Sequence, residues 1–318
     1  MKTKKVESLE NFAGAILIPI FETNPKNLIP IQFGDLSISA NVFYGKKDSH
    51  YLAQKNDSTL IFIGLGKSID YKSLKTIFRR IAVKEKESFS KKVAIQVPEE
   101  FSNEQVEAVI SGLLLGTYNL GHYKNQIEHP FLGSDFVLEI ASKVDFSDVV
   151  HQAIKIAKAQ LETLALVDLP PNKVTPKYLA TWAQDKGAKY GFDVKTLGLE
   201  ASKIEGLGAF LAVGKASQNE PQFVIMTYTP KGNTSKLKHI GLVGKGITFD
   251  TGGLNIKTAG MVHMKCDMAG GAAVFGAMQL IADLQLPVQI TAIVPCAENA
   301  VDKTAFLSSD VIQSYSGN

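Results

Sequence analysis

The stretch from Gly241 to Met278 restricts the fold of this 318-residue chain more than any other part of the sequence. A short apolar run of strand type ends at glycines that flank Lys245, and a helix start rich in glycine and alanine follows Asp267. Asp250 and Lys257 lie between them, among further glycines that allow tight backbone turns. The segment therefore predicts a strand, a glycine-rich loop and a helix, with charged side chains beyond the carboxyl end of the strand.

The charges in this stretch have two interpretations. Carboxylates are hard oxygen ligands for divalent cations, and an amine can join them once a cation has displaced its proton. Lys245, Asp250 and Asp267 are therefore candidate metal ligands, which leaves Lys257 charged to polarise a substrate carbonyl. The alternative is a surface loop with two salt bridges, because exposed ion pairs are common and weak.

The same residues carry a resemblance to a known family. The strings VGKGITFDTGG and MKCDMAGGAAV, with Lys257 between them, closely resemble the signature of the leucyl aminopeptidase family, the two-metal cytosolic aminopeptidases. The resemblance implies that Lys245, Asp250 and Asp267 are metal ligands, with Asp250 bridging two ions. It implies that Lys257 is the catalytic lysine that contacts the substrate carbonyl. Met264 would line the pocket for the first side chain, so Met264, Lys257 and Asp250 are the implied substrate-binding residues.

The resemblance also implies an activity. A family member is a hydrolase, a metalloprotease that releases N-terminal amino acids from peptides, with a leucine-like preference, by means of a metal-activated water. The implied cofactors are two divalent metal ions, manganese or zinc, with a bicarbonate in the complete enzyme. The implied partners are peptide substrates and further copies of the chain, with a hexamer expected.

One part of the family pattern is missing. The family's NTDAEGR motif, which supplies two further acidic ligands and an arginine that holds bicarbonate, does not occur in this sequence. Three ligands can hold one ion, but they are poor at holding two ions about 3.5–4 Å apart. The alternative to an active aminopeptidase is therefore a shortened, catalytically impaired homologue that acts in binding or assembly. An incomplete sheet would also expose apolar surface.

The rest of the chain predicts an α/β fold with two domains, each a mixed or parallel sheet flanked by helices. Its length suggests the same number of domains. We expect an N-terminal α/β domain over 1–145, a linker helix over 146–170, and an incomplete metallo-aminopeptidase catalytic domain over 171–318. Asn103 is the expected N-cap of a helix in the first domain. An amphipathic helix followed by a polar turn is expected over 200–221 in the second.

Composition narrows the function further. A content of 45% hydrophobic and 20% charged residues is typical of a soluble globular protein, and the net charge of +3 gives no support to nucleic-acid binding. There is no run of about 18 apolar residues, so no membrane partner is expected. The two cysteines, Cys266 and Cys296, form no CxxC pair and suit a reducing cytoplasm. Cys266 and His263 are interpreted as a packed thiol and a loop-lining imidazole rather than as ligands.

Overall fold

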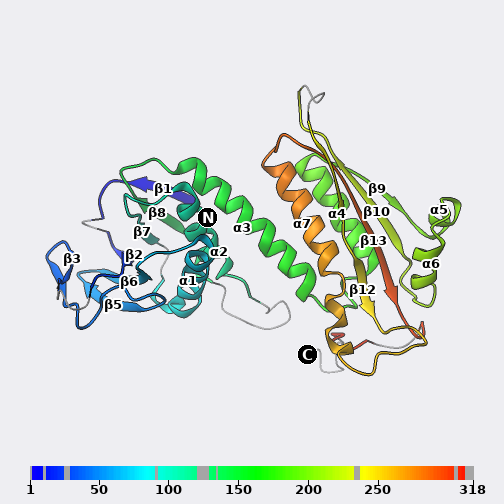
Figure 1. Ribbon diagram of the computed structural model, residues 1–318, viewed down its shortest axis with the longest axis horizontal. Helices are drawn as coiled ribbons and strands as arrows, with labels where there is room; N and C mark the ends of the chain where they lie inside the picture. Colours follow the sequence, from blue (N-terminus) through cyan, green and yellow to red (C-terminus); the bar gives the residue numbers. More distant parts are fainter. Residues whose placement is uncertain are drawn as a thin grey trace. The chain divides into compact units, whose positions relative to one another are not determined.

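The structure is a computed structural model (Figure 1), and it describes residues 2–9, 12–24, 29–89, 92–119, 129–133, 135–232, 237–303 and 307–311. The chain forms two compact units, Met1–Lys158 and Ala159–Asn318. The boundary falls inside helix α3 (Ser147–Asp168), so the predicted helix exists but belongs to both units. A separate linker over 146–170, with domains on either side of it, stays a prediction. No described helix is long and apolar enough to cross a membrane.

The first unit contains a six-stranded sheet in the order β1-β8-β7-β2-β6-β5. Neighbouring strands are parallel except for β5, which runs antiparallel to β6. The strands are β1 (Lys2–Val6), β2 (Gly14–Phe21), β5 (His50–Lys55), β6 (Ser58–Gly66), β7 (Lys92–Gln96) and β8 (Val137–Ala141). The sheet is thus mixed, as expected.

Among the described residues of this unit, helices cover one face of the sheet and leave the other to strands and loops. Ala15 and Leu17 of β2 pack with α1 (Tyr71–Lys84), α2 (Asn103–Leu115) and the start of α3. A short 3₁₀ helix, η2 (Lys86–Ser88), follows α1. Ile16 and Ile18 point the other way, because side chains alternate along a strand. They pack under the hairpin of β3 (Ile31–Phe33) and β4 (Leu36–Ile38) and the loop that follows it. A short 3₁₀ helix, η3 (Pro130–Leu132), precedes β8.

The second unit contains a mixed five-stranded sheet. Its strands are β9 (Asp193–Leu197), β10 (Gln222–Tyr228), β11 (His239–Val243), β12 (Gly246–Asp250) and β13 (Gln289–Asn299). The strand order is β11-β13-β10-β9, and β12 also pairs with β13. β10 lies between β9 and β13 and runs antiparallel to both, whereas β11 and β12 both run parallel to β13, one after the other along the same edge.

Helices cover both faces of the second sheet (Figure 1). On one face, α4 (Pro176–Tyr190) and α7 (Ala269–Asp283) enclose a core with the inward side chains of β10 and β13. On the other face lie α5 (Leu199–Ile204) and α6 (Gly208–Gly214), where Phe210 contacts Phe223 of β10 edge to face. A short 3₁₀ helix, η4 (Met261–Cys266), precedes α7. The expected α/β fold is therefore confirmed in both units.

Two local predictions are wrong. The single helix expected over 200–221 is divided into α5 and α6, because Gly206 adopts a left-handed φ of 70° that ends the first helix. The N-cap of α2 is Ser102 rather than Asn103. The Ser102 hydroxyl accepts from the Gln105 amide, and the Gln105 side chain accepts from the Ser102 amide, so this pair forms a capping box.

Candidate active site

Lys245 lies in a two-residue break in the edge of the second sheet. β11 ends at Val243 as the apolar run predicts, and the chain resumes pairing with β13 at Gly246. The Gly244 amide donates to Ile293 O at 3.0 Å, and the Gly271 amide at the start of α7 donates to Lys245 O at 2.7 Å. The backbone of Lys245 is thus held between the sheet and α7.

Glycines are required where α7 meets this break. A Cβ atom on Gly244 would lie 2.7 Å from Gly270 O and 2.8 Å from Gly271 Cα, and both are backbone atoms that cannot move aside. A Cβ on Gly271 would in turn lie 2.9 Å from Lys245 O. This close backbone approach brings Asp267, which precedes α7, up to Lys245.

The first ion pair of the site joins these two residues. Lys245 Nζ lies 2.8 Å from Asp267 Oδ2, with 58% of the lysine side chain and 21% of the aspartate side chain exposed. Asp267 Oδ2 is itself buried and has no hydrogen-bond donor of suitable angle among the residues that the structure describes. The approach of the amine is therefore a charge contact, and this buried oxygen retains capacity for another cation.

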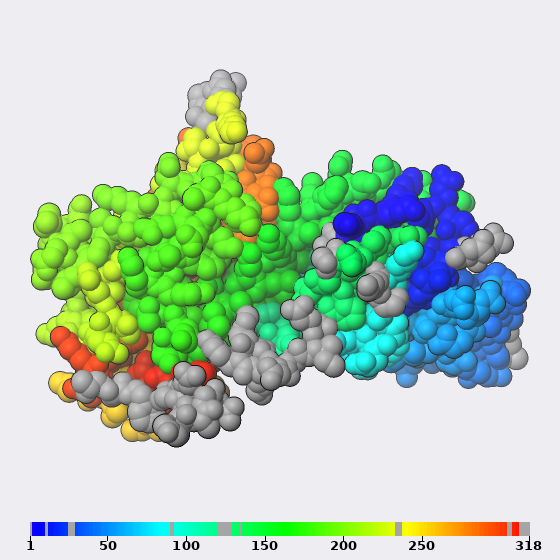
Figure 2. Space-filling model, turned by 180° about the vertical axis from the view of Figure 1, so that it is seen from behind, coloured from blue at the N-terminus to red at the C-terminus, as the bar shows by residue number. Residues whose placement is uncertain are grey.

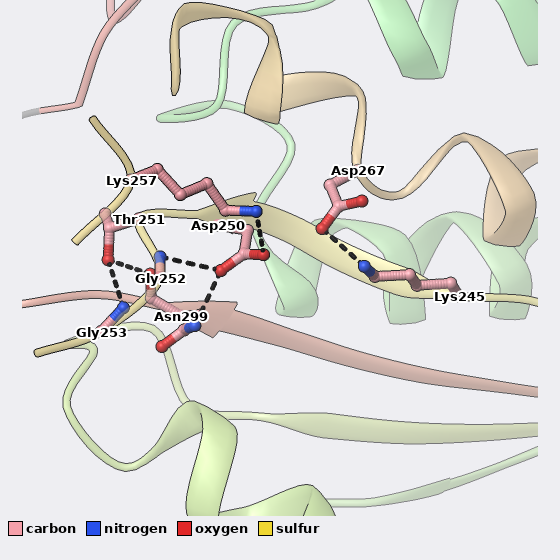
Figure 3. A network of polar contacts seen from close by, with 8 residues as sticks. All are labelled: Lys245, Asp250, Thr251, Gly252, Gly253, Lys257, Asp267 and Asn299. Atoms are coloured by element: carbon pink, nitrogen blue, oxygen red, sulfur yellow. Dashed lines mark hydrogen bonds and ion pairs between the residues drawn. The ribbon is translucent and has the colours of Figure 1, made fainter. Parts of the chain in front are cut away.

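The second ion pair joins Lys257 Nζ and Asp250 Oδ2 at 2.9 Å (Figure 3). The other oxygen, Asp250 Oδ1, accepts from the Gly252 amide at 3.0 Å and from Asn299 Nδ2 at 2.7 Å. Burial would raise the pKa of Asp250, but the bonds from Lys257, Gly252 and Asn299 outweigh it, so the pKa is lowered. This carboxylate is held ionised.

Both carboxylates affect the pKa of Lys257. Its hydrogen bond to Asp250 raises the pKa of Lys257, burial opposes the shift, and the charges of Asp250 and Asp267 raise the pKa further. The influence of Asp267 links the two ion pairs, which lie in a row in Figure 3. The structure thus brings together Lys245, Asp250, Lys257 and Asp267, as the sequence predicts.

A glycine turn directs Lys257 back toward Asp250. Gly252 and Gly253 have left-handed φ angles of 88° and 67°, and a Cβ on Gly252 would lie 2.3 Å from Asn255 O. The loop then returns, and the Lys257 amide donates to Thr251 O at 2.9 Å. Figure 2 shows this loop, in gold, at the same edge of the second unit as the end of β13, in red.

The segment that carries Met264 is anchored to the end of α3. Lys265 Nζ donates to Asp168 O at 2.8 Å, and Cys266 Sγ lies 3.9 Å from Val167 O. This contact agrees with a packed thiol at Cys266. Met264 is half-buried, and its place in a substrate pocket stays a prediction. His263 is exposed.

The sequence did not indicate Asn299, although it contacts the site directly. The available signal was positional, because Asn299 ends β13 directly opposite Asp250 at the end of β12. Polar residues at the carboxyl ends of adjacent parallel strands meet at one edge of a sheet. The sequence did not indicate Thr251 either. Its amide and its hydroxyl both donate to Asn299 O.

The donors of the site fit a divalent ion. Asp250 and Asp267 supply hard oxygens, one of them buried without a hydrogen bond, and Lys245 adds an amine. Within the described part of the chain, no cluster of three or more His, Cys, Asp or Glu side chains forms a metal site. A three-donor site here therefore needs Lys245 as a ligand.

Comparisons with known proteins relate this chain to aminopeptidases. Residues 163–318 match the family model described as "Cytosol aminopeptidase family, catalytic domain". A probable cytosol aminopeptidase of Microcystis aeruginosa is 35% identical over 294 residues, which cover 90% of this chain and 59% of that relative. This chain thus spans 59% of that relative's length.

Two solved structures share the fold. A tomato leucine aminopeptidase mutant superposes with a TM-score of 0.79 at 21% identity, over 100% of this chain and 66% of its own. The bottromycin maturation enzyme BotP in complex with Mn superposes with a TM-score of 0.76 at 23% identity, over 96% of this chain and 64% of its own. The matched segment contains the strand break, the glycine turn and both ion pairs, and on these grounds residues 163–318 belong to the cytosol aminopeptidase family, as part of its catalytic domain.

Proposed function

We propose that this chain forms the larger part of a metal-dependent aminopeptidase, in which Lys245, Asp250 and Asp267 bind a divalent ion and Lys257 is catalytic. The observation that carries the proposal is the pairing of each lysine with one aspartate at the edge of one sheet, at 2.8 and 2.9 Å. A surface loop with incidental salt bridges would not need a buried carboxylate oxygen without a hydrogen bond.

Lys245 and Lys257 have different duties in this proposal. Lys245 has to give up a proton before its amine can act as a ligand, which couples metal binding to proton release. Lys257 stays protonated, since both carboxylates raise its pKa, and it polarises the scissile carbonyl and stabilises the developing oxyanion. A bound divalent ion, manganese or zinc, would supply an activated water for the attack. The family match and the Mn complex of BotP support the use of a divalent metal.

The substrate assignment rests on the same family match. We assign peptides as substrates, a leucine-like first residue as the preferred side chain, and Met264, Lys257 and Asp250 as the residues that bind it. A second ion and a bicarbonate would need donors beyond the three named above. We also propose a cytoplasmic location and a hexameric assembly. The free cysteines and the word "cytosol" in the relative's name support the location.

A second function has one observation in its favour. The described residues provide three donors for metal, which is few for two ions that repel each other. A homologue of this kind would act in binding or assembly and would be catalytically impaired. The two functions differ in turnover, and a single assay distinguishes them.

The test is hydrolysis of leucine p-nitroanilide by the complete gene product with Mn²⁺ or Zn²⁺. We expect turnover by the natural protein, and a loss of at least about 100-fold in kcat for Lys257→Ala, because an oxyanion-stabilising charge is removed. Lys215→Ala is the matched control, since Lys215 is exposed and outside the site, and it should retain full activity. Equal turnover in Lys257→Ala and the natural protein, or no turnover with either metal, would reject the aminopeptidase.

A further inference from the structure

We infer that Asn299 is a positioning residue for Asp250: the side-chain amide of Asn299 fixes the direction in which the carboxylate presents its Oδ2 atom. The inference rests on the proposed function, because it concerns how that site holds its metal ligand. Asn299 Nδ2 donates to Asp250 Oδ1 at 2.7 Å, the shortest of the three hydrogen bonds that this carboxylate accepts.

The geometry divides the two oxygens of Asp250 between two tasks. Oδ1 accepts both the Asn299 amide and the Gly252 amide, which occupies its two lone pairs. Oδ2 faces Lys257, from the opposite side to Asn299 (Figure 3). A carboxylate held by one oxygen in this way cannot rotate about its Cβ–Cγ bond without breaking two hydrogen bonds. Among the described residues Oδ2 accepts only from Lys257, so it is the oxygen with a lone pair left for a cation.

The backbone of Asn299 already supports the turn without its side chain. Asn299 O accepts from the Thr251 amide at 2.9 Å and from the Thr251 hydroxyl at 2.7 Å. The Thr251 hydroxyl in turn accepts from the Gly253 amide at 3.1 Å. Since these contacts hold the strand ends together, the side-chain amide is free for the carboxylate. Its role is to aim Asp250 rather than to close the turn.

The amide also has a defined orientation. Asp250 is ionised and offers only acceptors, so the atom of Asn299 that faces it must be the donor, Nδ2. Asn299 Oδ1 then faces Gly253, where a Cβ atom would lie 3.2 Å away. Glycine at 253 therefore leaves room for the amide in this orientation. The orientation of the Asp250 carboxylate therefore depends on the position of β13. This strand pairs with β10, β11 and β12.

The test is Mn²⁺ binding by the protein carrying Asn299→Leu, which keeps the volume of the side chain and removes its donor. We expect the dissociation constant for Mn²⁺, measured by calorimetry or by the electron paramagnetic resonance of free Mn²⁺, to rise about 10- to 100-fold. Thr291→Val is the matched control, because it removes a hydroxyl that contacts His239 elsewhere on β13. The control should bind Mn²⁺ like the natural protein. Equal affinity in Asn299→Leu and Thr291→Val would overturn the inference.

A metal-free measurement separates this inference from the proposed function. In a crystal structure of metal-free Asn299→Leu, we expect the Asp250 carboxylate to turn and its contact with Lys257 to open beyond the ion-pair limit of about 4 Å. An unchanged carboxylate and ion pair would overturn the role of Asn299, whatever the protein does with Mn²⁺. Failure of the natural protein to bind Mn²⁺ would instead reject the metal site, while this crystal structure would still decide the role of Asn299.

Discussion

Single residues in the site combine unequal exposure with close charge contacts. Lys245 is more than half exposed, whereas the Asp267 oxygen that it approaches is buried. Such an ion pair adds little to folding stability, because water screens the exposed amine. This combination of an exposed amine and a buried carboxylate oxygen is more typical of two ligands that bind a cation than of a salt bridge that stabilises the fold.

Lys245→Met should separate these two roles. The variant keeps the length of the side chain and removes the amine, so we expect Mn²⁺ affinity to fall at least about tenfold while the free energy of unfolding without metal changes by less than about 1 kcal/mol. Lys215→Met, at an exposed position outside the site, is the control and should change neither quantity. A large loss of stability with unchanged Mn²⁺ affinity would mean that the Lys245–Asp267 contact is structural.

A buried histidine makes the first unit sensitive to acid. His129 Nε2 lies 2.9 Å from Ala82 O, which can only accept, and its Nδ1 accepts from the Phe131 amide at 3.2 Å. Both contacts need the neutral ring with its proton on Nε2. Burial lowers the pKa of His129 from 6.5, the bond to Ala82 opposes the shift, and the charge of Lys86 lowers the pKa further.

This lowered pKa fixes the direction of the pH effect. Below about pH 6.5 the unfolded chain binds more protons at His129 than the folded chain does. The contribution of the neutral His129 to the free energy of unfolding is therefore fully present above that pH, and it is lost as the pH falls toward the folded-state pKa. The loss should be at most about 1.4 kcal/mol per pH unit. Urea unfolding between pH 5 and 7.5 should show a shallower pH dependence in His129→Gln than in His151→Gln, whose parent histidine is exposed on α3. Identical slopes in the two variants would contradict this.

At the scale of elements, the site depends on how tightly α7 packs on the break between β11 and β12. Gly244→Ala should destabilise the second unit by about 1–3 kcal/mol, because the new methyl group would overlap the backbone of Gly270 and Gly271. Gly241→Ala on β11 is the control, since a Cβ there meets no heavy atom within 4 Å, and it should change stability by less than about 0.5 kcal/mol. Urea unfolding measures both. Equal stability of the two variants would contradict the packing described here.

The sequence predicted elements well where apolar periodicity is strong. Helix α3 and the strand that ends ahead of Lys245 follow directly from apolar spacing. β1 was missed because Lys2–Val6 is mostly charged, and its strand character comes from pairing with β8. β12 was missed because it has only five residues and lies in the glycine-rich stretch that predicted a loop, and its pairing with β13 is a tertiary contact.

The site shows the same division between local and tertiary signals. Lys245, Asp250, Lys257 and Asp267 lie close together in sequence, so their spacing identified them. Asn299 lies far along the chain and reaches Asp250 only through the pairing of β12 with β13. Sequence spacing alone cannot predict such a contact, because it depends on strand register.

At the scale of the whole molecule, the second sheet leaves β11 as an edge strand. Among the described residues, Ile240 and Val243 on this strand and Leu254 and Ile256 in the loop after β12 are exposed apolar side chains, with 78% of Val243 accessible. Exposed apolar edges favour association with further polypeptide. The expectation that an incomplete sheet causes this exposure, and the association expected from it, stay predictions.

Val243→Lys should test that association. The charge adds a gatekeeper to an exposed edge, so we expect the 318-residue chain to sediment as a smaller species than the natural chain at equal concentration, with unchanged stability. Val83→Lys is the control, because Val83 is an exposed valine on α1 in the other unit. Equal sedimentation of the natural chain and Val243→Lys would show that this edge does not mediate association.

The metal site itself is tested most directly by anomalous diffraction from crystals of the protein soaked in Mn²⁺. We expect a manganese peak in contact with Asp250, Asp267 and Lys245, at the edge of the sheet where β11 gives way to β12. We expect no such peak in Asp267→Asn. Crystals that take up Mn²⁺ elsewhere, or that leave the Lys245–Asp267 ion pair intact with no metal beside it, would contradict the proposed metal site.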